Sequence, residues 1–239
     1  MKIVSKALLL AVLFAAGGRA GALDQLGCPR EFSFEIRPDT DRRRAVKVLK
    51  RAVVENPCQS VQEAALGELA MVLWSRERLR EAWEALLDLR EERLSPQLRA
   101  VWLAAFGLLA QSDESAEIRR QSRDLLARFA RALEVAVHES AIGEMMYLIH
   151  ASFVAAGEKE MIFREIIRLA RDNSAGPARM RAIGALGDLS FVDEGEVYGR
   201  RARETLGSLR HDPDPVIRCE VEFVTDPAQE PAPECRSLE

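Results

Sequence analysis

Between about residue 40 and residue 225, apolar residues recur with a helical period, and glycine and proline fall between the helical stretches. The connections between these helical stretches are short, and short connections make successive helices antiparallel neighbours. The sequence therefore predicts an all-α chain of about five antiparallel helix pairs. The expected helices span 41–55, 60–75, 77–92, 96–111, 115–137, 140–156, 159–172, 177–191, 194–210 and 215–224.

Capping signals mark several of the expected helix starts. A small polar residue followed three positions later by an acid, or directly by proline, is typical of the first turn of a helix. The pairs are Ser60 with Glu63, Ser95 with Pro96, Gly176 with Pro177, Asp193 with Glu196, and Asp214 with Pro215.

The second helix of each expected pair recurs at a regular interval. These helices begin near residues 60, 96, 140, 177 and 215, so the successive spacings are 36, 44, 37 and 38. A period of about 40 residues built from helix pairs is typical of a solenoid, which exposes a long concave surface. We therefore expect an α-solenoid over residues 40–225.

Two segments carry a shared motif. Asn56–Ala70 reads NPCQSVQEAALGELA and Ala175–Ser190 reads AGPARMRAIGALGDLS, so Ala-Leu-Gly-acid-Leu occurs in both. With HDPDPVIR at His211–Arg218, these residues resemble HEAT-like repeats of the short bacterial kind found in bilin lyases. The resemblance is specific over 56–70 and 176–218, and over 77–170 only helix pairing and period support it. It implies architecture and partner binding, and it implies no chemistry.

The N-terminus has the composition of a secretory signal peptide. Lys2 and Lys6 precede the apolar run Ala7–Ala16, and Ala20–Ala22 fits an A-x-A cleavage site. A buried N-terminal helix is the competing interpretation. We expect a signal peptide over 1–22, an extended N-terminal cap over 23–39, and a proline-rich tail over 226–239.

Charge and hydropathy restrict the classes of partner that we expect. The chain carries 34 basic and 38 acidic residues, and cleavage would remove Lys2, Lys6 and Arg19, which leaves a net charge of 31 − 38 = −7. A nucleic-acid-binding protein is expected to have a basic surplus, so nucleic acid is not expected as a partner. The rest of the sequence contains no uncharged apolar run of about 18 residues, so no membrane span is expected after cleavage.

The four cysteines remain after cleavage, and an even number in an exported chain favours disulfides. Three connectivities are possible, and four free thiols are the other alternative. We expect Cys28–Cys58 and Cys219–Cys235, because each closes a local loop near one end of the chain.

The stretch HDPDPVIRCE, His211–Glu220, places a histidine, three acids and a cysteine close together, which raises the hypothesis of a metal or catalytic site. Aligned with NPCQSV, the same residues predict a turn, an N-cap at Asp214 and a helix start at Pro215. His138 and His150 have no carboxylate at metal-ligand spacing. We therefore expect no metal, no cofactor and no catalytic residues.

Glu139 supports one competing hypothesis. Glu139-Ser140 resembles the catalytic Glu-Ser of lytic transglycosylases, in which a glutamate acts as general acid on peptidoglycan. The downstream Gly-Leu-Met-Gln signature of that family is absent. Glu139 as an acid near a helix start is the simpler interpretation.

Two features are candidates for contact with a partner. The expected helix 115–137 carries a row of arginines, which forms either a basic stripe or a solvated face paired with Glu117, Asp124 and Glu134. Trp74 ends its helix and is expected to be exposed, whereas Trp83 and Trp102 are expected in the core. The candidate partner-binding residues are Arg119, Arg120, Arg123, Arg128, Arg131 and Trp74.

Together these patterns predict an exported, non-enzymatic interaction scaffold that binds a protein or peptide. A peptidoglycan-active envelope enzyme with Glu139 as its acid, and a structural subunit of an envelope complex, are the alternatives.

Overall fold

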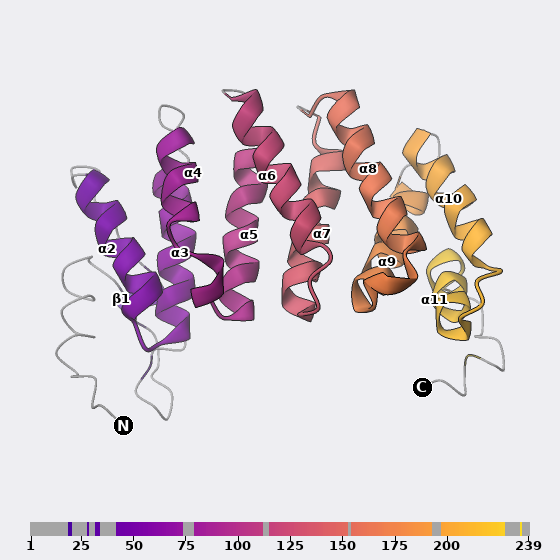
Figure 1. Ribbon diagram of the computed structural model, residues 1–239, viewed down its shortest axis with the longest axis horizontal. Helices are drawn as coiled ribbons and strands as arrows, with labels where there is room; N and C mark the ends of the chain where they lie inside the picture. Colours follow the sequence, from indigo (N-terminus) through magenta and orange to yellow (C-terminus); the bar gives the residue numbers. More distant parts are fainter. Residues whose placement is uncertain are drawn as a thin grey trace. The chain divides into compact units, whose positions relative to one another are not determined.

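The computed structural model describes residues 19–20, 28, 32–33, 42–73, 79–111, 115–152, 154–192, 197–227 and 235. The chain forms two compact units, Met1–Ser122 (unit 1) and Arg123–Glu239 (unit 2). Within the described ranges the structure is helical apart from one pair of two-residue strands (Figure 1). The all-α prediction is confirmed for these residues.

Unit 1 is built around helix α3. Its elements are β1 (Arg19–Ala20), β2 (Phe32–Ser33), α2 (Arg42–Glu55), α3 (Gln59–Leu73), α4 (Leu79–Leu87), the 3₁₀ turn η1 (Glu91–Arg93) and α5 (Pro96–Ala110). Helix α3 packs against α2, α4, α5 and β2. The strands pair antiparallel, with Arg19 opposite Ser33 and Ala20 opposite Phe32. Strand β1 therefore lies inside the segment expected to be a signal peptide.

Tryptophan and phenylalanine side chains join α4 to α5. Trp102 is fully buried, as expected, and its Nε1 donates a hydrogen bond to the Leu86 carbonyl at 2.9 Å. The Phe106 ring meets both Trp102 and Trp83 edge-on, at centroid distances of 4.6 and 5.0 Å. Trp83 is half-buried. The indole hydrogen bond satisfies the one polar atom of Trp102, so its large apolar ring can be buried without a desolvation penalty.

Unit 2 is built around helix α9. Helix α6 (Ala116–Phe129) crosses the boundary between the units, and α7 (Val135–His150), α8 (Ala156–Arg171), the 3₁₀ turn η2 (Asn173–Ala175), α9 (Pro177–Val192), α10 (Val197–Leu209) and α11 (Pro215–Thr225) follow. Helix α9 packs against α7, α8, α10 and α11. In Figure 1, α8 and α10 lie in front of α9 and α11, so these helices form two layers.

Gly187 permits the contact between α9 and α11. A Cβ atom added at this position would lie 2.8 Å from the Val224 Cβ, closer than non-bonded carbon atoms approach one another. The glycine of the Ala-Leu-Gly-acid-Leu motif is therefore needed here for packing. Gly67, at the same motif position in α3, has no atom within 4 Å of an added Cβ among the described residues.

Three of the expected helices are wrong in extent. The expected helix 140–156 is observed as α7, Val135–His150. The sequence suggested one helix over 115–137, but α6 ends at Phe129 and α7 begins at Val135. The expected helix 77–92 ends at Leu87, and Arg90 then adopts a φ of 50° before η1. Both breaks occur without glycine or proline, so tertiary contacts override the local helix preference.

The capping predictions are confirmed at Ser95 and Asp214. The Ser95 hydroxyl accepts a hydrogen bond from the Leu98 N–H at 3.2 Å, and the Asp214 carboxylate accepts one from the Val216 N–H at 2.9 Å. Ser60 is not an N-cap, because α3 already begins at Gln59. Helix α9 begins at Pro177, as expected, and the expected pair Asp193 and Glu196 lies outside the described residues.

Both expected disulfides are present. Cys28 is bonded to Cys58 and Cys219 to Cys235, and the described residues include no free cysteine. The first bond fixes a residue of the expected N-terminal cap to the turn before α3. The second fixes a residue of the tail to α11. The remainder of both terminal segments lies largely outside the described residues.

Removing the second disulfide should destabilise unit 2. The Cys219→Ala/Cys235→Ala double variant opens a loop closed over a sequence separation of 16 residues, so the unfolding free energy should fall by about 3 kcal/mol in urea titration. Peptide mapping of the wild-type chain under non-reducing conditions is the control. A peptide that links Cys28 to Cys235 would contradict the pairing.

Candidate functional site

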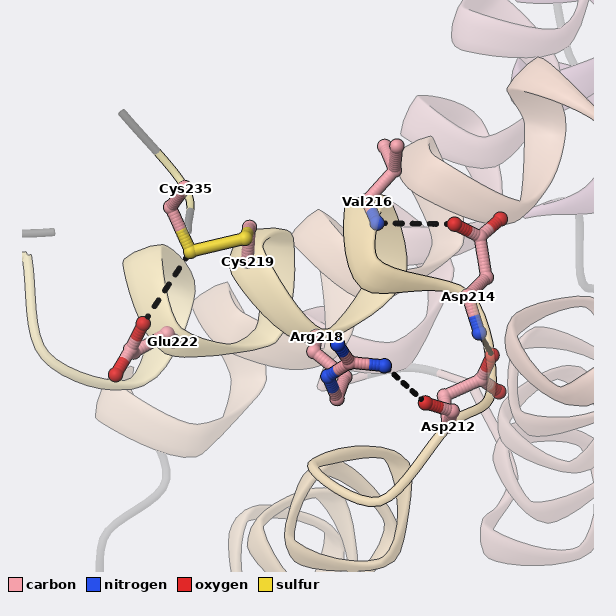
Figure 2. The surroundings of a disulfide bond; sticks show 7 residues. All are labelled: Asp212, Asp214, Val216, Arg218, Cys219, Glu222 and Cys235. Atoms are coloured by element: carbon pink, nitrogen blue, oxygen red, sulfur yellow. Dashed lines mark hydrogen bonds between the residues drawn. A yellow bond between two sulfur atoms is a disulfide. The ribbon is translucent and has the colours of Figure 1, made fainter. Parts of the chain in front are cut away.

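The stretch HDPDPVIRCE forms the turn between α10 and α11 and the first turns of α11 (Figure 2). The Asp212 carboxylate accepts the Asp214 N–H at 3.0 Å, which closes the turn. The Asp214 carboxylate caps α11, and Arg218 donates to the Asp212 carbonyl at 2.9 Å. Asp212 and Asp214 are therefore occupied by backbone donors, as the turn-and-cap interpretation predicts, and His211 is exposed.

A buried ion pair anchors this turn to the rest of unit 2. Arg179, near the start of α9, donates from Nη2 to the Asp212 carboxylate and from Nε to the Ala170 carbonyl at 2.9 Å. The two side chains are only 6% and 8% exposed. Burial opposes ionisation of Asp212, but the hydrogen bonds from Arg179 and the Asp214 N–H outweigh it and lower the pKa of Asp212.

A side-chain oxygen of Asn or Asp accepts the backbone N–H two residues later at four places, at 2.9 to 3.0 Å. Three of these contacts close a turn, and the pairs are Asn56 with Cys58, Asp172 with Ser174, and Asp212 with Asp214. The fourth is the helix cap that Asp214 forms with Val216. Asp172 and Asp212 both precede a helix of the same layer of unit 2.

A second kind of contact recurs in the first turn of four helices. A side chain there contacts a backbone carbonyl in or near the preceding turn, at 2.9 to 3.3 Å. The contacts are Arg99 with Leu94, His138 with Ala132, Arg179 with Ala170, and Arg218 with Asp212. The carbonyl can only accept, so the His138 contact is a hydrogen bond in the tautomer with the proton on Nδ1. This contact gives buried His138 a structural partner.

Glu139 lies in the second turn of α7, because that helix begins at Val135 and not at residue 140. Its side chain is exposed. Among the described residues, no group of three His, Cys, Asp or Glu side chains could hold a metal ion. His150 is exposed at the end of α7.

The arginine row is divided between α6 and the turn that follows it. Arg120 pairs with Glu117 at 2.8 Å, and Arg128 lies over the Phe129 ring at 4.6 Å. Arg119 is half-buried and has a partner within the chain. Trp74 lies outside the described residues.

Arg123 and Arg131 bind acids of α8 and of the turn after it. Arg123 Nη1 lies 2.6 Å from Glu158 Oε1, although their angle falls outside hydrogen-bond geometry. Arg131, which lies beyond the end of α6, pairs with Asp172 at 3.0 Å and Glu165 at 3.5 Å. These two arginines therefore connect segments of unit 2.

Acids of α7, α9 and α11 differ from those of α8 in whether they have a charged or hydrogen-bonding partner. Glu158, Glu160 and Glu165 of α8 each lie within 3.5 Å of an arginine. In the described part of the chain, no hydrogen bond or ion pair involves four acids of α7, α9 and α11. These acids are Glu139, Glu144, Asp188 and Glu220.

Aromatic side chains accompany these acids. Tyr147 of α7, Phe191 of α9 and Phe223 of α11 are 54%, 51% and 67% exposed. Gly143 of α7 has no atom within 4 Å of an added Cβ among the described residues, and Gly184 of α9 has only the end of the Arg181 side chain, at 3.7 Å. We call the surface formed by the following residues the acidic-aromatic face: Glu139, Gly143, Tyr147, Gly184, Asp188, Phe191, Glu220 and Phe223.

Helical spacing places these residues on one side of each helix. Positions 139, 143 and 147 recur every four residues in α7, and 184, 188 and 191 follow the same rule in α9. Helix α9 packs between α7 and α11. In all three helices the buried residues occupy other positions than the residues of the acidic-aromatic face. Sequence reasoning missed this face. The signal that could have found it is the row of acids and aromatic residues within otherwise apolar second helices.

The sequence matches no protein-family model, and no curated protein or solved structure is significantly similar to it. The described helices include none that is both long enough and apolar enough to cross a lipid bilayer. The structure itself defines a chain whose described residues are helical apart from the β1–β2 pair and which has two disulfide bonds, and these bonds fit an oxidising environment.

Loss of Asp212 should strongly destabilise unit 2. Asp212→Ala leaves the buried Arg179 charge without its partner, so the unfolding free energy should fall by about 3 kcal/mol at pH 7. Asp214→Ala removes only an exposed cap and should cost about 1 kcal/mol. Both values can be measured by chemical denaturation.

The effect of Asp212 should depend on pH. Because the folded-state pKa lies below the ordinary value of 3.8, the stabilisation is present above pH 3.8 and is lost as the pH falls through the folded pKa. The stability difference between the wild type and Asp212→Ala should therefore shrink in acid. An equal difference at low and neutral pH would contradict the ion pair.

Glu144→Gln should stabilise the protein at alkaline pH. Burial raises the pKa of Glu144 to about 7, from an ordinary value of 4.5. The folded state therefore holds this proton more tightly, and the unfavourable contribution grows between pH 4.5 and 7. After allowance for partial exposure, the variant should gain about 1–2 kcal/mol at pH 8 and nothing near pH 4. Thermal unfolding at both pH values would measure this, and an equal gain at both would contradict it.

Proposed function

We propose that the chain is an exported, non-enzymatic scaffold that binds a partner protein or peptide. In this proposal the helices form a HEAT-like α-solenoid of about five antiparallel pairs, as the sequence period suggests. The second helices are α3, α5, α7, α9 and α11, which start at positions 59, 96, 135, 177 and 215, so the successive intervals are 37, 39, 42 and 38. This spacing supports a repeat of about 40 residues.

The recurrence of one turn geometry is the observation that carries this proposal. The Asx-type turns at Asp172 and Asp212 are one period apart, and Asn56 precedes Asp172 by about three periods. Repeats share their turns because each turn sets how one pair stacks on the next. Chemistry that recurs at the turns serves architecture, and this favours binding over catalysis.

Export is supported by two independent features. The segment 1–22 has the composition of a signal peptide. Both disulfides lie near the ends of the chain, where a terminal repeat lacks a neighbour and needs its apolar side covered. An oxidising compartment such as the bacterial periplasm or the extracellular space would maintain these bonds.

Crosslinking in the native cell tests the scaffold. The tagged full-length chain should be recovered from the exported fraction without residues 1–22, oxidised, and crosslinked to a discrete partner. Arg120→Glu/Arg128→Glu tests whether the arginines of α6 contribute to that partner's binding. Retention of residues 1–22, or no crosslinked partner, would contradict the proposal.

A direct assay separates the scaffold from the envelope-enzyme alternative. The purified chain should release no soluble fragments from peptidoglycan above a buffer control, and Glu139→Gln should give the same result. Release by the wild type that Glu139→Gln abolishes would overturn the non-enzymatic assignment.

A further inference from the structure

From the acidic-aromatic face of unit 2 we infer a binding site for a cationic, apolar peptide segment of a partner protein. This inference rests on the scaffold proposed above and names the surface and the chemistry of its partner. The face lies on helices α7, α9 and α11 of unit 2.

The negative charge of the acidic-aromatic face favours a cationic partner. Glu139 and Asp188 are exposed and Glu220 is half-buried, and none has a partner in the described part of the chain. Apart from buried Arg179, the half-buried Arg181 is the one arginine or lysine among the described residues of α7 and α9, and it lies on the same side of α9 as Gly184 and Asp188. Three acids against this one arginine leave the face negatively charged. A carboxylate that loses water on burial gains most from an incoming cation, since the charge it meets is then poorly screened.

Glu220 shows this cost directly. Burial raises its pKa, and no neighbouring charge offsets the effect. The acids of α8 have the opposite environment: the hydrogen bond from Arg201 leads the interactions that lower the pKa of Glu160. The chain therefore satisfies its acids on α8 and leaves those of the acidic-aromatic face for another molecule.

Apolar contacts come from the same face. Tyr147 and Phe223 expose more than half of their surface. Aromatic residues are enriched at binding sites because they bury a large area with little loss of side-chain freedom. Gly143, one turn before Tyr147, has no described atom within 4 Å of an added Cβ, and Gly184 has only the end of the Arg181 side chain, so a second main chain can approach α7 and α9 closely at these positions. Lysine or arginine alternating with apolar residues would match both features.

The size of the face sets the length of the segment. Packed helices lie about 8–10 Å apart, so the distance from α7 to α11 across α9 is about 20 Å. An extended chain covers about 3.3 Å per residue, and about six residues therefore cross the face. A membrane is a poorer match, because anionic headgroups would meet unpaired carboxylates.

Calorimetric titration with a synthetic peptide tests the inference. The probe has about ten residues and alternates lysine with leucine and phenylalanine, and its control replaces each lysine by glutamate. The oxidised mature chain should bind the lysine peptide with a micromolar dissociation constant and the glutamate peptide at least tenfold more weakly. Equal affinities, or no binding of the lysine peptide below about 1 mM, would overturn the inference.

Two matched pairs of variants locate the binding. Asp188→Lys/Glu220→Lys should weaken the lysine peptide at least tenfold, while Asp124→Lys/Glu204→Lys makes the same change in net charge on α6 and α10 and should have less than a threefold effect. Tyr147→Ser/Phe223→Ser should also weaken it, unlike Met161→Ser/Val197→Ser, which removes comparably exposed residues of α8 and α10. Circular dichroism checks that each variant is folded. Equal losses within either pair would overturn the inference.

Photo-crosslinking separates this inference from the scaffold itself. A photoreactive phenylalanine analogue at position 147 or 223 should crosslink the native partner in cells, and the same group at position 161 should not. A partner captured only from position 161 would overturn the face and leave the scaffold standing. No partner from any of the three positions would contradict both.

Discussion

The ion pair between Arg179 and Asp212 is the contact on which the packing of unit 2 most depends. It connects the end of α8, the start of α9 and the turn before α11 through one buried guanidinium group. A buried charge is tolerated only where its partner and its remaining donors are satisfied, so the pair fixes these three segments in one arrangement. The pair lies at the start of helix α9, which contacts four other helices of unit 2.

Two kinds of contact at the turns recur along the chain. An Asn or Asp closes the turns before α3, α9 and α11, and a side chain in the first turn of α5, α7, α9 and α11 bonds a carbonyl in or near the preceding turn, so the two contacts occur together before α9 and α11. Arginine fills this second position in α5, α9 and α11, and His138 fills it in α7. Polar groups that would be costly to bury are thereby satisfied within the turns.

Local signals predicted the parts of the fold that depend on local physics. Ser95 and Asp214 cap their helices because a small polar side chain before proline can reach the first free N–H groups. The pairing of the cysteines followed from short loops near each end. In the same way, the acids of HDPDPVIRCE were explained by a turn and a helix start.

Long-range contacts decided the features that the sequence did not reveal. The break between α6 and α7 contains no helix breaker, but Arg131 is held by acids of α8 and the following turn, and the Ala132 carbonyl bonds His138. Whether an acid such as Asp188 has a partner likewise depends on which helix lies beside it, and helical periodicity does not specify this.

The acids of unit 2 fall into those that bind partners within the structure and those that have none in the described part of the chain. Carbon-13 NMR titration of the side-chain carboxyl groups tests this division most directly. We expect Asp212, Asp172 and Glu160 to titrate with a pKa below their ordinary values, Glu144 with a pKa of about 7, and Glu220 with a raised pKa. Ordinary pKa values for both groups of acids, or a raised pKa for Asp212, would contradict the account.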